Sequence, residues 1–252
     1  MHDDHERRTS FGAVAEAYDR HRMPYRAEVY DAIAARSGVD GSSRILELGA
    51  GTGIATRALA RWGAPITAIE PSAEMASVLR RRAPRHVSTV ESRFEDWSDP
   101  EPPYDLVAAA QSWHWIEPAA KFERLPALMA PDGVLAVFAH AAVDAFALGQ
   151  PAYRRWTATS KRGPLPSLDE RVASLADPIR AHYRDVRVDR WPWARTFSPE
   201  EYVALLSTYS DHSTLPEPNR SNLFAELAEA IREAGGRIER RYETVLVTAA
   251  RR

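Results

Sequence analysis

The chain has 252 residues, which suits one α/β domain with a sizeable buried core. It contains no cysteine, so disulfides, thiolate metal sites and cysteine nucleophiles are excluded. The net charge of -2 provides no general attraction to nucleic acid or to an anionic membrane. Because we find neither a signal peptide nor a long apolar stretch, we expect a cytoplasmic protein with a small-molecule partner. We expect no nucleic acid, membrane or metal partner, and a monomer or homodimer.

Two amphipathic segments follow a polar start. Apolar residues recur at helical spacing over residues 11–18 and 25–35, and Met23-Pro24 separates the two segments. We expect two helices that cap a site formed further along the chain. Residues 1–40 are assigned to this cap.

Strand and helix patterns alternate between residues 41 and 140. Such alternation predicts a parallel sheet with right-handed crossovers, and ligands bind such sheets beyond the carboxyl ends of the strands. The arginine run at 80–82 is interpreted as the solvated end of a helix. The predicted strands are 44–48, 65–69, 87–91, 106–110 and 134–138, and the predicted helices are 54–60, 73–82 and 118–129.

The alternation stops after residue 140. Prolines between residues 141 and 185 favour irregular helical pieces, and we expect this insertion to cover the substrate side. Ser198 and Pro199 are typical of a helix start. Residues 186–252 are expected to complete the sheet, so that residues 1–252 form a single domain. The last predicted elements are a strand at 186–191, helices at 198–207 and 222–233, and a strand at 240–248.

Residues 45–53 are the most informative stretch, with the sequence Ile-Leu-Glu-Leu-Gly-Ala-Gly-Thr-Gly. A buried strand end, a glycine turn and a following helix make a ligand site at the helix N-terminus. The dinucleotide fingerprint requires glycine at its sixth position, which is Ile54 here when counted from Gly49. Glu47, two residues before that glycine, suits a cationic amino-acid group and repels a diphosphate.

Glu70 ends the next apolar strand, where its two carboxylate oxygens can accept both hydroxyls of a ribose. The acid, the GxGxG turn and Glu70 together resemble the class I S-adenosylmethionine-dependent methyltransferases. The resemblance implies S-adenosylmethionine as the cofactor. It also implies an α/β fold: a Rossmann-like seven-stranded sheet with helices on both faces, whose antiparallel last strand lies between the fifth and sixth.

The resemblance extends to the N-terminal cap. Tyr18, Arg22 and Tyr25 match a Tyr-x-x-x-Arg-x-x-Tyr pattern of the type 11 branch of these enzymes, in which such side chains close over the methionine end of the cofactor. An arginine there can pair with the cofactor carboxylate by a forked contact. Tyr25 equally suits a role in packing a helix.

Residues 93–96 follow the third strand, where the family contacts adenine. Phe94 and Glu95 are the expected contacts. The family more often has a small polar residue and an alanine where this chain has Arg93 and Phe94.

The stretch Gln111-Ser112-Trp113-His114-Trp115 follows the fourth strand and should border the sulfur of the cofactor. Tryptophans beside a histidine supply an apolar wall with one titratable group, and aromatic faces attract a sulfonium. His114 is interpreted either as a general base or as a residue that hydrogen-bonds the cap.

Two further histidines suit the acceptor side. Tyr209 and His212 match a Tyr-Ser-x-His pattern of the same branch. His140 ends the fifth strand and, by topology, points to the same edge.

These inferences define one set of site residues. The expected catalytic residues are His114, Tyr18 and His212. The expected cofactor-binding residues are Tyr18, Arg22, Glu47, Gly49, Ala50, Gly51, Thr52, Gly53, Glu70, Pro71, Met75, Phe94, Glu95 and Gln111. The expected acceptor-binding residues are Tyr25, Trp113, His114, Trp115, His140, Tyr209 and His212.

The expected reaction is an in-line SN2 transfer of a methyl group to an oxygen, nitrogen or carboxyl acceptor. Trans-aconitate methylation is the nearest named activity of this branch. Two alternatives stay open: a non-catalytic S-adenosylmethionine-binding sensor or assembly protein, and a nicotinamide enzyme.

Overall fold

The computed structural model describes residues 15–98, 103–144, 146–157 and 166–252. The polar start of the chain and residues 11–14 of the first predicted helix lie outside the described residues. So do parts of the predicted insertion, at residue 145 and residues 158–165.

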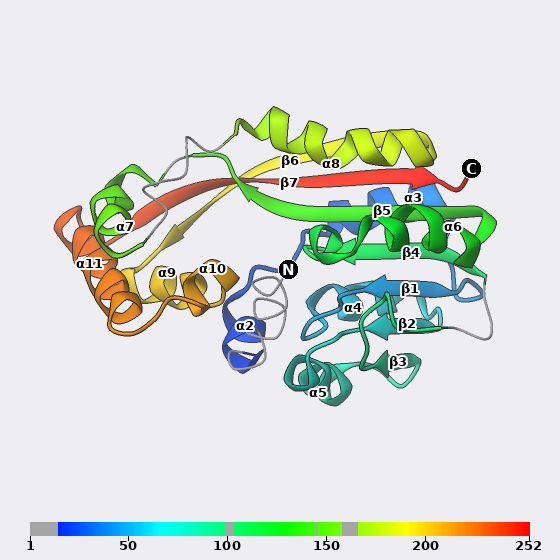
Figure 1. Cartoon of the computed structure of the whole chain (residues 1–252), viewed down its shortest axis with the longest axis horizontal. Coiled ribbons are helices and arrows are strands. Elements are labelled where there is room, and N and C mark those ends of the chain that lie inside the picture. Colours follow the sequence, from blue (N-terminus) through cyan, green and yellow to red (C-terminus); the bar gives the residue numbers. More distant parts are fainter. Residues whose placement is uncertain (1–14, 99–102, 145, 158–165) are drawn as a thin grey trace.

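Seven strands form one mixed sheet in the order β3-β2-β1-β4-β5-β7-β6 (Figure 1). β1 to β5 are parallel, whereas β7 is antiparallel to both of its neighbours, β5 and β6. The expected Rossmann-like order is therefore confirmed. The strands are β1 (Ile45–Leu48), β2 (Ile66–Ile69), β3 (Val87–Val90), β4 (Tyr104–Ala110), β5 (Met129–Ala142), β6 (Arg184–Phe197) and β7 (Ile238–Ala250).

The centre of the sheet positions the site. All four residues of β1 are buried, as expected for a parallel strand that is covered on both faces. The chain runs outward from β1 to β2 and β3, then returns to place β4 on the other side of β1. A crevice forms beyond the carboxyl ends of the strands at such a reversal.

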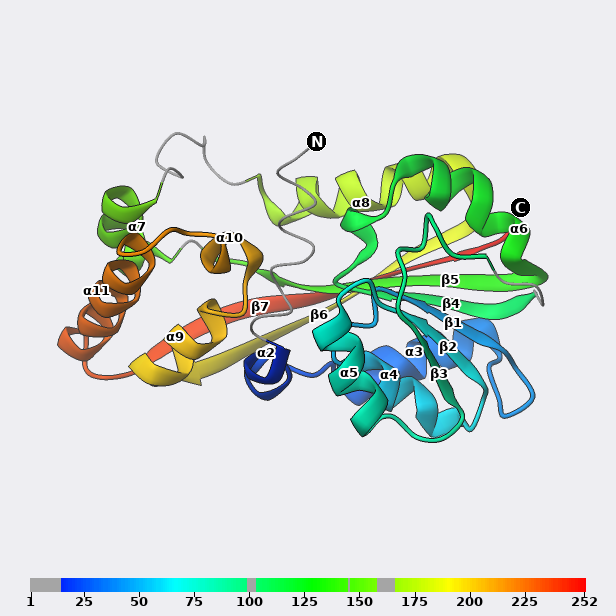
Figure 2. The ribbon, with the colours of Figure 1, turned by 60° about the horizontal axis from the view of Figure 1, so that its bottom comes forward.

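Helices cover both faces of the sheet (Figure 2). α3 (Ala27–Ser37), α4 (Ile54–Leu59) and α5 (Ala73–Arg82) lie on one face, where Val29, Leu59 and Leu79 join one core cluster. α6 (Leu125–Leu128) and α8 (Leu168–His182) lie on the other face. Short turns complete the connections: η2 (Ala60–Trp62), η3 (Trp113–Trp115), η4 (Ala120–Arg124) and η5 (Ala147–Gly149).

The region after residue 140 differs from the expectation of irregular pieces. β5 continues to Ala142, and α8 is a regular helix of 15 residues that packs on β6 and β7 instead of on the substrate side. A capping box between Ser167 and Glu170 starts this helix. Burial of Ala176 and Ile179 stabilises it in spite of Pro178, which we expected to break a helix.

The last two strands are longer than predicted and carry a helical lobe. β6 and β7 pair from Arg184–Ala250 to Phe197–Ile238, well past the last pair of β5 with β7 at Ala142–Tyr242. Around this extension α7 (Gln150–Trp156), α9 (Pro199–Leu206), α10 (Ser210–Ser213) and α11 (Asn219–Glu233) pack with their own apolar cluster (Figures 1 and 2). We call these four helices the lobe.

One short helix joins the two parts. α2 (Ala15–His21) contacts α5 of the sheet region and α9 of the lobe. No helix of the described segments is both long and apolar enough to cross a membrane.

Ser198 at the start of α9 allows a test of the lobe. Its hydroxyl accepts a hydrogen bond from the Glu201 amide, and the Glu201 carboxylate accepts one from the Ser198 amide. Ser198→Ala should lower the free energy of unfolding in urea by about 1 kcal/mol. Ser207→Ala, at the other end of the same helix and outside the capping box, should cost less than about 0.5 kcal/mol. Equal losses would contradict the capping role.

Candidate functional site

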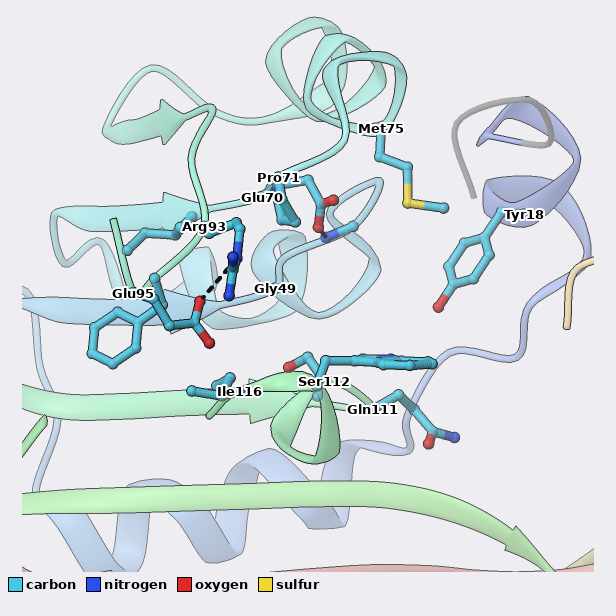
Figure 3. A pocket seen from close by; sticks show the side chains of 15 residues that line it. Tyr18, Gly49, Glu70, Pro71, Met75, Arg93, Glu95, Gln111, Ser112 and Ile116 are labelled. Atoms are coloured by element: carbon cyan, nitrogen blue, oxygen red, sulfur yellow. Dashed lines mark hydrogen bonds and ion pairs between the residues drawn. The ribbon is translucent and has the colours of Figure 1, made fainter. Parts of the chain in front are cut away.

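A cavity lies beyond the carboxyl ends of β1, β2 and β4 and the loop after β3 (Figure 3). It encloses about 740 Å³ of space, a volume that includes the open solvent at its mouth. Residues from seven segments of the chain line it: Tyr18, Gly49, Gly51, Ile69, Glu70, Pro71, Met75, Arg93, Phe94, Glu95, Ala110, Gln111, Ser112, Trp115 and Ile116.

The glycine turn forms one wall. Gly49, Gly51 and Gly53 have φ angles of 66°, 59° and 88°, in the left-handed region that favours glycine. A Cβ atom on Gly49 would lie 2.5 Å from Ser112 Cβ, whereas one on Gly51 would meet only Met75 Sδ at 4.0 Å. Gly49 therefore serves close packing, while Gly51 keeps the cavity open.

Glu70 lies at the base of the cavity between two main-chain donors. Its Oε2 accepts a hydrogen bond from the Gly51 amide and its Oε1 accepts one from the Ser72 amide, each at 2.8 Å. Burial raises the pKa of Glu70 to about 7, although both amide bonds oppose this shift. The carboxylate thus ties the glycine turn to the N-terminus of α5.

The loop after β3 supplies a charged wall. The Arg93 guanidinium donates to Glu117 at 2.8 Å and lies 3.5 Å from the Glu95 carboxylate, which accepts from the Glu117 amide. The Phe94 ring is buried beside it. Arg93 and Glu95 point into the cavity in Figure 3.

The end of β4 supplies the opposite wall. Gln111 has a φ of 58°, which is rare for a residue with a Cβ. Its side-chain amide donates to the His140 carbonyl at 3.1 Å. The Ser112 hydroxyl donates to the Leu48 carbonyl at the end of β1. Trp115 lies half-buried along the same wall.

α2 closes one side of the cavity. Tyr18 projects from this helix toward the cavity, and Met75 projects from α5 beside it (Figure 3). Both side chains belong to a small apolar cluster with Ala15 and Val78.

Several expected cofactor residues do not line this cavity. Glu47 is buried on the α4 side of β1, where burial raises the pKa of its carboxyl to about 8 and the Thr56 hydroxyl opposes the shift. Thr52 is fully buried, and Ala50 and Gly53 belong to the turn without lining the cavity. Their expected contacts with the cofactor stay a prediction.

The tryptophan–histidine stretch divides between core and cavity. Trp113 is 5% exposed and packs edge-on against Phe122 in the core. His114 is exposed and packs against Trp115 at a ring distance of 4.6 Å. Partial desolvation, and then the Lys121 ammonium, lower the pKa of His114 to about 4, so the imidazole is neutral at pH 7. Solvent around the exposed ring weakens this shift but does not change that charge state.

Of the expected acceptor residues, Trp115 lines this cavity, and the others are not among its lining residues. Tyr25 stacks on His140 at 4.3 Å, and His140 Nδ1 lies 2.9 Å from the Thr244 hydroxyl. Arg22 donates to the Thr208 carbonyl at 3.0 Å and lies over the Tyr209 ring.

His212 is enclosed in the lobe. Its Nε2 lies 2.8 Å from the Tyr153 hydroxyl and its Nδ1 lies 2.9 Å from Asp211 Oδ1, so both ring nitrogens are engaged within the lobe.

Five cavity residues were missing from the expected set. Arg93 and Ser112 stand beside expected residues in the sequence. The structure shows that they line the cavity as well. Nothing in the sequence marked the apolar members as cavity residues. The five are Ile69, Arg93, Ala110, Ser112 and Ile116.

The sheet order, with a cavity at the strand ends, is that of the class I methyltransferase fold. Residues 18–210 match a family model described as "Methyltransferase domain", so the chain belongs to that family and is a methyltransferase. An uncharacterized methyltransferase of Mycobacterium tuberculosis is 27% identical over 219 residues, which cover 84% of this chain and 81% of that protein. Trans-aconitate 2-methyltransferase of the same species is 32% identical over 138 residues, or 50% of this chain and 51% of that protein.

Solved structures agree on the fold. A putative type II methyltransferase of Anaeromyxobacter dehalogenans superposes with a TM-score of 0.66 at 18% identity, over 92% of this chain and 97% of that one. Phosphoethanolamine N-methyltransferase 2 of Haemonchus contortus, in complex with S-adenosyl-L-methionine, superposes with a TM-score of 0.55 at 14% identity. That match covers 95% of this chain and 57% of that one.

Gly49 and Gly51 have different surroundings, so alanine substitutions at these two positions test their roles against each other. Gly49→Ala should lower the free energy of unfolding by about 2 to 4 kcal/mol, because it adds left-handed strain and a clash with Ser112. Gly51→Ala should cost only about 1 kcal/mol of stability but weaken S-adenosylhomocysteine binding roughly tenfold. Urea unfolding and calorimetric titration measure the two effects. An unchanged affinity in Gly51→Ala would show that ligand does not approach this turn.

Proposed function

We propose that this methyltransferase uses S-adenosylmethionine to methylate a small-molecule acceptor by in-line SN2 displacement. The observation that carries the proposal is the position of Glu70 at the base of the cavity, beside Gly51.

Glu70 has the hydrogen-bonding capacity that a ribose needs. A carboxylate offers about four lone-pair sites, and the two main-chain amides occupy one on each oxygen. One acceptor site on each oxygen is left for two neighbouring hydroxyls. The bare Gly51 main chain beside it leaves room for the sugar, so the residues present fit a nucleoside cofactor.

Other cavity residues suit the remaining parts of the cofactor. We propose that Phe94 and Glu95 border the adenine, and that Tyr18, Met75 and Trp115 border the sulfonium. Aromatic faces attract a sulfonium cation and exclude water from it. Arg22, on the lobe side of Tyr18, remains the proposed partner of the cofactor carboxylate.

The chemistry asks for positioning more than for proton transfer. The bound sulfonium supplies an already activated methyl group, and the protein then has to align the acceptor and exclude water. A carboxylate acceptor needs no base, whereas a neutral acceptor loses a proton. His114 is the proposed base, since its neutral imidazole lies next to Trp115 at the cavity wall. Tyr18 is proposed to orient the reacting groups.

The proposed acceptor is a small molecule and not a nucleic acid. The net charge of -2 argues against a polyanion, and carboxyl methylation is in keeping with the trans-aconitate 2-methyltransferase among the relatives. Residues 1–252 are proposed to act as one domain. A sensor without turnover is the alternative function, which the same cavity would fit.

Cofactor affinity should depend on pH through Glu70. Hydroxyl donors favour the ionised carboxylate, so binding below its pKa of about 7 releases a proton. Affinity for S-adenosylhomocysteine should therefore rise up to about tenfold from pH 6 to pH 8 and then level off. Calorimetry in buffers of different ionisation enthalpy measures both the affinity and the proton release.

Glu70→Gln is the control for that dependence. Glutamine keeps the size but has one acceptor oxygen for the two amides, so binding should weaken by about 1 to 3 kcal/mol. The pH dependence should largely disappear, even though Glu47 also titrates near this range with its pKa of about 8. A pH dependence that persists in Glu70→Gln would assign it to another group.

Turnover separates the enzyme from the sensor. Incubation with methyl-labelled S-adenosylmethionine and panels of small acids, phenols and amines should give a labelled product. With a phenol or amine acceptor, His114→Ala should lower kcat at least tenfold with little change in cofactor affinity. With a carboxylate acceptor the same variant should keep its rate. Cofactor binding without any product would favour the sensor.

A further inference from the structure

α2 carries Tyr18 at the cavity but has little apolar contact of its own. Its described part, Ala15–His21, is seven residues long, and Ala15 is the apolar residue buried there. A helix of this length is not stable in isolation, so tertiary contacts must hold it in place. The contacts that hold α2 therefore determine where Tyr18 lies.

One of these contacts is ionic and comes from Asp19, the residue next to Tyr18. The Asp19 side chain is only 4% exposed. Its Oδ1 accepts from Arg57 Nη2 of α4 at 3.0 Å, and its Oδ2 pairs with Arg82 of α5. One buried carboxylate thus joins α2 to two helices of the sheet region.

Arg57 extends this link to the glycine turn. Its Nη1 donates to the Thr52 carbonyl at 3.0 Å while its Nη2 donates to Asp19. A planar guanidinium with two such bonds fixes the direction of both partners. Arg57 therefore fixes the distance between the glycine turn, which lines the cavity, and α2, which closes it.

The arginine run at the end of α5 takes part as well, although its side chains are 42% to 54% exposed, as expected of a solvated helix end. Arg81 and Arg82 both pair with Glu16 of α2, but the Glu16 side chain is 54% exposed. Exposed pairs of this kind contribute little. Asp19 is the buried member of the network and the one that we expect to matter.

We propose that Asp19 is a positioning residue that holds Tyr18 across the cofactor cavity through Arg57 and Arg82. This inference rests on the proposed S-adenosylmethionine site. Asp19 itself does not line the cavity. Through Asp19, cofactor affinity depends on an ionic contact between α2, α4 and α5.

The test compares Asp19→Asn with Asp31→Asn. Asp31 forms a similar pair with Arg61 at 2.6 Å, but it lies on α3 with its side chain 67% exposed. Asp19→Asn should weaken S-adenosylhomocysteine binding roughly tenfold, or about 1.4 kcal/mol at 25 °C. Asp31→Asn should bind like the wild type. Equal affinities of all three proteins would overturn the proposal.

A double-mutant cycle with Tyr18→Leu tests whether Asp19 acts through Tyr18. If it does, Asp19→Asn should weaken binding less than about twofold further in the Tyr18→Leu protein. The full tenfold loss in that background would overturn the proposal, because it would show an effect independent of Tyr18.

Hydrogen exchange distinguishes positioning from general stability. In Asp19→Asn, amides of residues 15–22 should exchange faster while those of the sheet keep their protection. Faster exchange across the whole chain would indicate a structural role only and would overturn the proposal.

A second variant and the wild type complete the test. Should Asp19→Asn fail to fold, Arg82→Gln removes one of the two partners at a helix end and should weaken binding in the same direction by a smaller factor. An unchanged affinity there would overturn the proposal. Absence of S-adenosylhomocysteine binding by the wild type would instead remove the proposed function itself.

Discussion

Burial of the Glu70 carboxylate is the constraint on which the arrangement of the cavity depends. A buried carboxylate is costly unless hydrogen bonds satisfy it, and here the amides of Gly51 and Ser72 do so. Those two amides belong to the turn after β1 and to the start of α5, so satisfying the charge brings both segments to the end of β2. Burial raises the pKa of Glu70 to about 7, although both amides lower it. A ligand with two hydroxyl groups would complete the solvation that the protein leaves incomplete.

The cavity also depends on contacts far from it. The lobe packs around the extended ends of β6 and β7, and α2 lies between this lobe and α5. Arg22 at one end of α2 bonds to the Thr208 carbonyl, while Asp19 bonds to Arg57. The helix that closes the cavity is thus held from two sides by polar contacts, with few apolar ones. Such contacts are directional, which suits a segment that must place one side chain over a ligand.

Local patterns predicted the sheet well because parallel strands that are buried on both faces are apolar runs, and the glycine turn requires left-handed residues. They were less accurate between residues 141 and 185, where the prolines predict irregular helical pieces, whereas α8 forms around Pro178 because burial of Ala176 and Ile179 outweighs the lost hydrogen bond. The predicted helices at 198–207 and 222–233 are confirmed by α9 and α11. The lengths of β6 and β7 were also missed, since their outer halves pair with each other beyond β5.

By itself, the sequence determined the class of fold, the position of the glycine turn and the position of Glu70 directly after the next strand, because these depend on short-range spacing. Only the tertiary structure decided which side chains reach the cavity. Trp113 and Glu47 stand beside cavity residues in the sequence yet point into the core, whereas Arg93 and Ser112 point into the cavity. His212 lies enclosed in the lobe with both nitrogens bonded. The direction of a side chain depends on partners from distant segments, and local sequence does not contain them.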